Sequence, residues 1–460
     1  MVTQTCLEKP ASGFDMKLHL LQFFKACNPS KTINSANPQE RQYYIDFSAV
    51  RGGKVVEALE RTITRLSPDE PTCQLFTGHI GCGKSTELLR LKARLEEQDF
   101  HVVYFESSRD LDMADVSVSD ILLAIARSVS ESLENAGVRL KPAYFQNLFQ
   151  EVKDFLQVPV ELNAEAELSL GIARITAKTK ENPKLREQLK QSLEPRTESI
   201  LRAINQEILE RGNQELQYQG KQGLVVIVDN LDRITPRPAT STRSLPEHLF
   251  IDRESQLRRL QCHLVYTIPL NLIFSNDYQT LKNRLGGGVA PTILPMVPVQ
   301  NRQGQKHSQG MGLLRQLVLA RAFPDLDPET RLTLISTIFD HPDTLDRLCR
   351  VSGGHIRNLL GLLFTCLRQD DPPISRECVE SVIGAYRDDI LLAVEDHEWE
   401  LILEVVKKQD LSGEQDYQIL LRSMFVFEYR DEQGRWFGIN PALAETDKFK
   451  ALISAGSPMK

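Results

Sequence analysis

One glycine-rich string, at residues 78–86, has residue types and spacing that suit phosphate chemistry. It satisfies the pattern G-x-x-x-x-G-K-[ST] between an expected strand and an expected helix. The glycines let the backbone curl so that successive N–H groups point at one phosphate, and the helix N-terminus adds partial positive charge. Lys84 is expected to neutralise β- and γ-phosphate oxygens, and Ser85 to ligate Mg²⁺. The string predicts an ATP-binding loop formed by Gly78, His79, Ile80, Gly81, Cys82, Gly83, Lys84, Ser85 and Thr86.

A second candidate is Asp229, which ends the apolar run 224–229. Such a run is typical of a strand buried in a parallel sheet, and we expect it next to the strand that precedes the glycine loop. At its tip, Asp229 is expected to serve as the protein's carboxylate partner of Mg²⁺. The alternative is a core strand that merely ends in an acidic turn.

Hydrolysis also needs a group that orients the attacking water. Many P-loop ATPases place a Glu directly after the Mg²⁺ aspartate, but Asn230 stands there in this chain. Asp232 is the nearest other acid and is therefore the candidate base. The alternative is that Asp232 pairs with Arg233 or caps the following segment, with very slow turnover.

Two further residues could contact a γ-phosphate. Thr267 lies at the end of the apolar run 263–268, where a small hydroxyl could sense the phosphate or hold the water. Such a Thr is more often simply a strand residue. Arg357 follows the string Ser-Gly-Gly-His-Ile, and an Arg one turn into a helix opened by glycines can deliver a guanidinium to phosphate. Its alternative is an ordinary helix start.

The elements that must position these residues alternate between strands and helices up to residue 298. The five expected strands are the one before the glycine loop and the apolar runs 102–105, 224–229, 263–268 and 292–297. This order predicts an α/β fold: a P-loop NTPase parallel sheet with helices on both faces. Later residues are mostly helical and end in the order helix, helix, hairpin, which fits a winged-helix module. Alternation at 160–176 predicts a hairpin or two short strands inside an insertion. The expected regions are a leader with no core of its own at 1–45, an ATPase core at 46–298 with a mostly helical insertion at 134–222, a helical lid at 299–385 and a winged-helix-like domain at 386–460.

Composition narrows the class of protein. The 460 residues carry a formal charge of −7, which argues against a generic polyanion binder. The eight cysteines form no C-x-x-C pair, as expected of reduced thiols in an intracellular protein. No apolar stretch approaches the roughly 20 residues that span a bilayer, and the N-terminus lacks the features of a signal peptide. We expect a cytoplasmic protein without a membrane segment.

These four motifs, in this order, resemble the AAA+ and STAND-type ATPases of the P-loop superfamily. The nearer likeness is to the branch with Orc/Cdc6-like, NACHT-like and KAP-like ATPases, and the string GHIGCGKSTEL is similar to uncharacterised bacterial AAA ATPases. The resemblance implies that Lys84 and Ser85 belong to Walker A, Asp229 to Walker B, Thr267 to sensor 1 and Arg357 to sensor 2. It also implies an arginine finger, for which the candidates are Arg253, Arg258, Arg259 and Arg284.

The departure at Asn230 favours a slow switch over a fast motor, because the spacing of Asp229 and Asp232 is closer to the STAND and KAP pattern. The first hypothesis is an ATP- and Mg²⁺-dependent switch that controls homo-oligomerisation or the binding of an unknown protein partner. The second is a DNA-associated AAA+ ATPase of replication, transposition or mobile-element type. A third is a nucleotide-binding scaffold without turnover. Residues 383–460 carry 9 Lys/Arg and 15 Asp/Glu, which argues against DNA, whereas the basic stretch 174–190, with a net charge of +4, argues weakly for it.

Overall fold

The computed structural model describes residues 18–140, 143–156 and 182–456. The predicted hairpin at 160–176 lies outside these residues, as do Arg174, Lys178 and Lys180 of the basic stretch. Among the described residues, no helix is both long and apolar enough to cross a bilayer.

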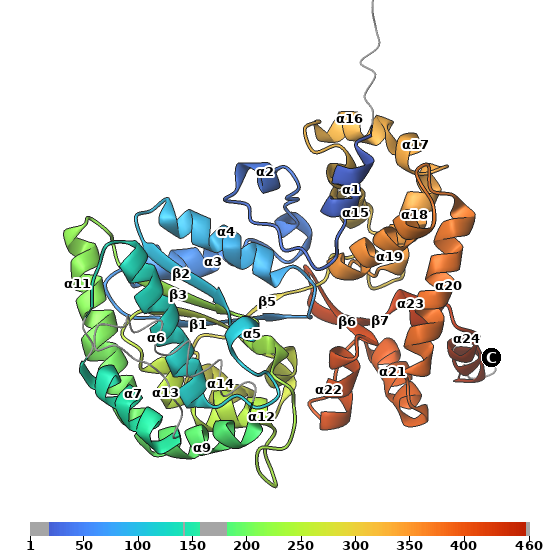
Figure 1. The fold of residues 1–460 in the computed structure, drawn as a ribbon. Coiled ribbons are helices and arrows are strands. Elements are labelled where there is room, and N and C mark those ends of the chain that lie inside the picture. Colours follow the sequence, from blue (N-terminus) through green and yellow to red (C-terminus); the bar gives the residue numbers. More distant parts are fainter. Residues whose placement is uncertain (1–17, 141–142, 157–181, 457–460) are drawn as a thin grey trace, which may run out of the picture.

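A parallel sheet of five strands forms the centre of the core (Figure 1). All five predicted strands are present, and every neighbouring pair is parallel. One expectation was wrong: the strand that ends in Asp229 does not adjoin the strand before the glycine loop, because β4 lies between them. Strand order depends on long connections and has no local signal in the sequence. The order across the sheet is β2 (His101–Glu106), β3 (Leu224–Asp229), β4 (His263–Thr267), β1 (Cys73–Gly78) and β5 (Thr292–Leu294).

Alternate residues of the buried strands face opposite layers of helices. Val225 and Ile227 pack with the helices α3 and α4, whereas Val226 and Val228 pack with α6. Both faces of the sheet are therefore covered, which explains why these strands are apolar throughout. The helices of the core are α3 (Val55–Arg61), α4 (Lys84–Glu96), α5 (Ser107–Asp110), α6 (Val118–Asn135), α7 (Ala143–Leu156), α9 (Pro183–Leu193), α10 (Thr197–Ala203), α11 (Glu210–Tyr218), α12 (Leu245–Glu247), α13 (Glu254–Arg258) and α14 (Tyr278–Asn283).

A second, helical region follows the sheet and lies beside it (Figure 1). The N-terminal segment joins this region, since Phe23 and Cys27 are buried in the same apolar cluster as Met311 and Leu314. The segment expected to be a leader thus supplies core residues to the lid. The helices are α1 (Leu20–Ala26), α2 (Pro38–Arg41), α15 (Ser308–Ala322), α16 (Pro328–Thr333), α17 (Ile335–Ile338), α18 (Pro342–Val351), α19 (Ile356–Gln369) and α20 (Arg376–Leu392).

Residues 396–456, which we name the C-terminal module, have the predicted order of helix, helix and antiparallel hairpin. The hairpin lies between the core and the lid in Figure 1. Its backbone joins the core directly, because the Met296 N–H donates to the Glu428 carbonyl at 2.9 Å. The elements are α21 (Asp396–Lys408), α22 (Gln415–Arg422), β6 (Val426–Asp431), β7 (Gly434–Ile439), α23 (Pro441–Ala444) and α24 (Asp447–Gly456).

Candidate nucleotide-binding site

The glycine loop runs from the end of β1 to the first residue of α4, as predicted. Gly81 and Gly83 have φ of +88° and +106°, values that side chains rarely allow. A Cβ on Gly81 would also lie 2.7 Å from His355 Cε1 and 2.9 Å from Arg357 Cβ. Glycine at this position therefore has two effects: it allows the loop to curl, and it lets the lid approach the loop closely.

Lys84 is buried, and its three N–H donors all have partners inside the protein. Nζ donates to the carbonyls of Gly78 at 2.7 Å and His79 at 2.8 Å, and it lies 2.9 Å from Asp232 Oδ2. The charge of Asp232 opposes the effect of burial and holds the pKa of Lys84 above its usual value. The lysine is therefore held folded back against its own loop by a buried ion pair.

Asp232 thus pairs with Lys84. The sequence analysis had left open an ion pair between Asp232 and Arg233 instead. Its Oδ1 is buried and has no hydrogen-bond partner among the described residues. A buried carboxylate oxygen without a donor is unfavourable, so this atom is suited to accept a hydrogen bond from a bound molecule or water. The predicted role as base is compatible with that position.

Asp229 lies at the tip of β3, buried beside the first turn of α4. It accepts hydrogen bonds from the Tyr104 hydroxyl at 2.8 Å, from the Asn230 N–H at 2.7 Å and from the Ser85 hydroxyl. Burial, followed by the charge of Asp232, raises the pKa of Asp229. The sequence did not single out Tyr104, which lies on β2 and reaches Asp229 across the strand pairing of β2 and β3.

The Ser85 hydroxyl and the Asp229 carboxylate fit a Mg²⁺ ion that also takes phosphate oxygens and water. The two groups are already in contact, and a magnesium site of this kind needs only one or two groups from the protein. In the described part of the chain, no cluster of three or more His, Cys, Asp or Glu side chains could hold a metal by itself. The donor set therefore suits a cation that arrives with a nucleotide.

Asn230 has a backbone reason for its identity. Its φ is +67°, in the left-handed region that Asn tolerates better than Glu does. Its side-chain amide donates to the Ser108 hydroxyl at 3.2 Å. Asn230, which stands where many P-loop ATPases have a catalytic Glu, thus also forms the turn that places Asp232 next to Lys84.

Thr267 is fully buried, and its hydroxyl is engaged with β3 and the turn that follows it. Oγ1 accepts the Leu231 N–H at 3.0 Å and donates to the Val228 carbonyl at 3.4 Å. Among the described residues, Thr267 is not one of those that line the cavity around Ser85 and Arg357. In this arrangement, the hydroxyl holds the turn between Asp229 and Asp232 and does not face the phosphate loop.

Arg357 lies against the loop. It is in the first turn of α19, and the start of this helix after two glycines agrees with the prediction. Its N–H donates to the Gly81 carbonyl at 3.2 Å, and burial lowers the pKa of its guanidinium. Arg357 lines a cavity of about 80 Å³ together with the loop residues. Residues that the sequence did not single out complete this cavity: Pro29, Ser30, Lys31, Thr32, Ile33, Arg233, Arg321, Ile356 and Leu360.

The four arginine-finger candidates all have partners in their own chain. Arg253 pairs with Glu194, and Arg259 with Glu198 at 3.0 Å. Arg258 donates to the Arg284 carbonyl at 2.8 Å, and Arg284 lies 3.7 Å from Glu254. The described contacts favour none of the four as a free finger.

The C-terminal module contacts the glycine loop through His79, a connection that the sequence did not reveal. His79 Nε2 accepts the Glu428 N–H at 3.0 Å, and the ring also donates to the Leu421 carbonyl. The ring of Phe427 lies 5.8 Å from that of His79, edge to face, and 6.0 Å from that of His355, stacked. Phe427 therefore links a phosphate-loop residue to the lid.

His355 makes the third side of this contact. It caps α19 by accepting the Asn358 N–H on Nδ1 at 2.9 Å, so its Nε2–H donates to the Ile80 carbonyl at 2.7 Å. Burial lowers the pKa of His79 to about 3 and that of His355 to about 4, so both rings are neutral near pH 7. Neutral rings keep the acceptor nitrogens that these hydrogen bonds require.

Glu428 provides a pH test of how the hairpin is docked. Burial raises its pKa from the usual 4.5 to about 7, with Arg435 opposing this effect. Because the unfolded chain ionises at lower pH than the folded chain, Glu428 stabilises the fold below pH 4.5 and this stabilisation is lost as the pH rises through about 7. We expect Glu428→Gln to gain stability relative to wild type as the pH rises, by up to about 3 kcal/mol above pH 7.

Denaturant unfolding of the wild type and Glu428→Gln at pH 4.5 and pH 8 measures this difference. The exposed neighbour Glu432 supplies the control Glu432→Gln, which should show no such trend. Parallel pH profiles for wild type and Glu428→Gln would disprove the assignment.

Comparison with known proteins agrees with this geometry. Residues 53–251 match the model of the KAP family P-loop domain. The core of this chain has the fold of a P-loop NTPase domain. The match confirms the predicted resemblance to KAP-like P-loop ATPases over these residues, and it covers the glycine loop, Asp229 and Asp232. No curated protein matches the chain.

Solved structures align with nearly the whole chain at low identity. The Orc1 protein of Aeropyrum pernix in complex with DNA is 15% identical, with a TM-score of 0.38 and 94% of this chain and 98% of that chain covered. A Walker-type ATPase of Pyrococcus abyssi is 11% identical, with a TM-score of 0.40 and coverage of 88% and 98%. Cdc6p of Pyrobaculum aerophilum is 13% identical, with a TM-score of 0.38 and coverage of 94% and 97%.

Proposed function

We propose that this protein is a slow ATPase that works as a nucleotide-dependent switch. One observation carries the proposal: the phosphate loop is bonded to the C-terminal module through His79, while Lys84 of the same loop is bound to Asp232. A nucleotide phosphate and the present internal partners compete for the same loop. Binding of nucleotide is thereby coupled to the position of the module.

The loop residues have named roles in this proposal. The N–H groups of Gly78–Thr86 and the Lys84 ammonium bind phosphates, Ser85 and Asp229 hold Mg²⁺, and Arg357 contacts the γ-phosphate from the lid. For Lys84 to reach a phosphate, its bonds to the carbonyls of Gly78 and His79 must be exchanged. Since the His79 side chain holds the module, a change in the loop backbone at this residue reaches Glu428 directly.

Such a shift requires nucleotide to favour one arrangement over the other. The lid supplies that difference, because Arg357 and His355 contact the loop at adjacent residues, Gly81 and Ile80. ATP and ADP differ in the γ-phosphate that Arg357 would contact, so the two nucleotides are expected to leave the module in different positions. Thr267 acts here as a positioning residue, holding the turn that carries Asp232.

We further propose that the moved module exposes a surface for homo-oligomerisation or for a partner protein, in the cytoplasm. The proposed domains are those of the sequence analysis, with the leader packed on the lid and with the lid extended to Leu392, because α20 runs through the expected limit at 385. The winged-helix-like order of the module is assigned here to protein contact, because residues 383–460 carry a net charge of −6. Phosphate contacts dominate nonspecific DNA binding, and an acidic module opposes them.

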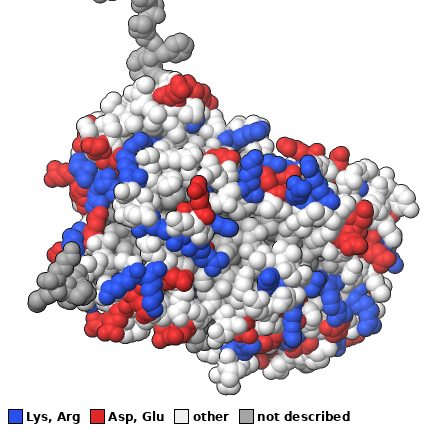
Figure 2. Space-filling view, turned by 180° about the vertical axis from the view of Figure 1, so that it is seen from behind, with Lys and Arg blue, Asp and Glu red and all other residues white. Residues whose placement is uncertain are grey.

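A DNA-associated role gains no support from the described part of the basic stretch. Arg186 and Lys190 both lie on Asp115, at 3.1 and 3.3 Å, so their charges are partly neutralised within the chain. Figure 2 shows Lys and Arg interspersed with Asp and Glu over the face in view, without separation into a basic and an acidic half. We therefore use duplex DNA as an added component in the turnover experiment that follows, to test this role directly.

Asp232→Asn tests the proposal through ATP turnover of the purified protein, with and without duplex DNA. If Asp232 is the base, we expect turnover to fall by about 10²- to 10⁴-fold while nucleotide binding persists, because Asn can hydrogen-bond but cannot accept a proton. The control is Asp252→Asn, an exposed acid that pairs with Arg243 outside the site. Unchanged turnover in Asp232→Asn would refute the role of Asp232 as the base. Absence of turnover in the wild type would indicate a nucleotide-binding scaffold. Stimulation of turnover by DNA that weakens with salt would favour the DNA-associated alternative.

A further inference from the structure

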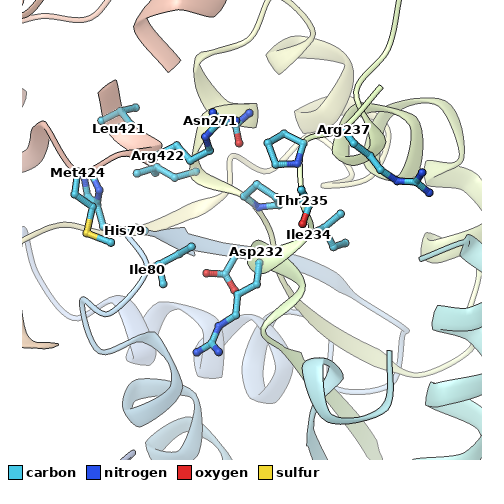
Figure 3. Close-up of a pocket in the computed structure, with 15 residues that line it drawn as sticks. His79, Ile80, Asp232, Ile234, Thr235, Arg237, Asn271, Leu421, Arg422 and Met424 are labelled. Carbon is cyan, nitrogen blue, oxygen red and sulfur yellow. The ribbon is translucent and has the colours of Figure 1, made fainter. Parts of the chain in front are cut away.

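A cavity of about 590 Å³ lies beside the phosphate loop, between the core and the C-terminal module (Figure 3). Its walls come from the loop at Gly78–Ile80, from the turn after β3, from the segment after β4 and from the end of α22. It is separate from the 80 Å³ cavity around Ser85 and Arg357, although Ile80, Asp232 and Arg233 line both. Its volume is in the range of small-molecule sites.

The cavity combines an apolar interior with a positively charged rim. Arg233 and Arg422 are exposed, and neither guanidinium has a hydrogen-bond or ion-pair partner that the structure places among the described residues. Arg237, on the same rim, is bound to Asp115. The apolar lining comes from Ile80, Ile234, Pro236, Leu270, Leu421 and Met424.

Asp232 is the acidic residue among those that line the cavity, and its negative charge is neutralised by Lys84. The site therefore carries a net positive charge in a chain whose total is −7. The same Asp232 presents Oδ1, which is buried and without a donor among the described residues, and its side chain lies at the edge of the cavity in Figure 3. The walls of one cavity thus offer a ligand two unpaired guanidinium groups and an unused acceptor oxygen.

We propose that this cavity binds a small organic anion with an apolar body. Its carboxylate or phosphate group pairs with the guanidinium of Arg422 or of Arg233, its apolar part fills the interior, and a hydroxyl or amide N–H donates to Asp232 Oδ1. Charge-assisted hydrogen bonds to Arg are among the stronger polar contacts. The unpaired arginines distinguish this site from an ordinary gap between domains.

Such a ligand would touch the phosphate loop and α22 at the same time. His79 and Ile80 of the loop line the cavity together with Leu421 and Met424 of the C-terminal module. This position lets the ligand act as the input of the proposed switch, a role that rests on the proposed function. Binding itself needs neither nucleotide nor turnover.

Two fluorescent probes of similar shape test the site in the full chain without nucleotide. 8-Anilinonaphthalene-1-sulfonate carries an anionic group on an apolar body, and N-phenyl-1-naphthylamine lacks the charge. We expect saturable binding of the sulfonate, weakened about tenfold in the double variant Arg233→Gln/Arg422→Gln by the loss of two charge-assisted hydrogen bonds. Binding of the neutral probe should be unchanged, and so should both probes in Arg65→Gln, an exposed arginine outside the cavity.

A second variant tests the location. Thr235 is exposed and lines the cavity, so Thr235→Trp should fill it and abolish binding of both probes. Equal affinity of the sulfonate for wild type and the double variant would overturn the proposal, as would displacement of the probe by excess ADP, which would place it in the nucleotide site. Because the titration uses no nucleotide, its failure leaves the switch standing, and a failed turnover experiment leaves this site standing.

Discussion

Lys84→Ala should weaken ATP binding by about 10- to 100-fold, since hydrogen bonds to charged groups contribute about 1.5–3 kcal/mol. The same change should also destabilise the protein, because it leaves Asp232 as an unpaired buried charge. Breaking a buried ion pair by removing one partner costs about 3–5 kcal/mol. Nucleotide titration and denaturant unfolding measure the two effects separately.

The double variant Lys84→Ala/Asp232→Asn separates stability from binding. Removal of the uncompensated charge should recover most of the lost unfolding free energy without restoring ATP binding. Lys92→Ala, on the same helix α4, is the matched control, because Lys92 pairs with the nearby Glu96 at the surface. Full stability in Lys84→Ala alone would show that the ion pair with Asp232 is absent in solution.

Phe427→Ala is the second change with a large expected effect. The ring is fully buried between His79 and His355, and truncation of a buried Phe costs about 3–5 kcal/mol. We also expect the variant to bind ATP while its C-terminal module no longer responds to the nucleotide. Amide hydrogen exchange in the hairpin, with and without ATP, measures that response.

Phe437→Ala is the matched control, because it removes a ring of the same size from the same hairpin. Phe437 packs against Phe274, 5.5 Å away, and has no ring contact with either histidine. We expect similar destabilisation with the nucleotide response retained. Loss of the response in both variants would mean that stability of the hairpin, rather than the contact with the histidines, carries the coupling.

The features that the sequence predicted well are local ones. The glycine loop and the five strands can each be predicted from a short run of consecutive residues: a motif, an apolar run or a turn. The helix start before Arg357 was equally visible, because two glycines precede it. Each of these signals depends on neighbours along the chain and needs no knowledge of the tertiary fold.

The features that the sequence missed depend on segments far apart in the chain. The insertion of β4 between β1 and β3 follows from strand order, and the pairing of Lys84 with Asp232 follows from the turn at Asn230. Asn230 was interpreted through catalysis alone, although its positive φ supplies a backbone reason. No periodicity in the hairpin distinguishes Phe427 from any other buried strand residue, so its position between two histidines required the structure.

The central claim is that the phosphate loop controls the docking of the C-terminal module, and hydrogen–deuterium exchange of residues 426–439 tests it most directly. Exchange would be compared in wild type without nucleotide, with ATP and Mg²⁺ and with ADP and Mg²⁺, and in Lys84→Ala at the same nucleotide concentrations. We predict that ATP changes protection of the hairpin, that ADP gives a different level, and that Lys84→Ala responds to neither below saturation. Identical protection of the hairpin in all wild-type samples, with ATP shown to be bound, would contradict the account.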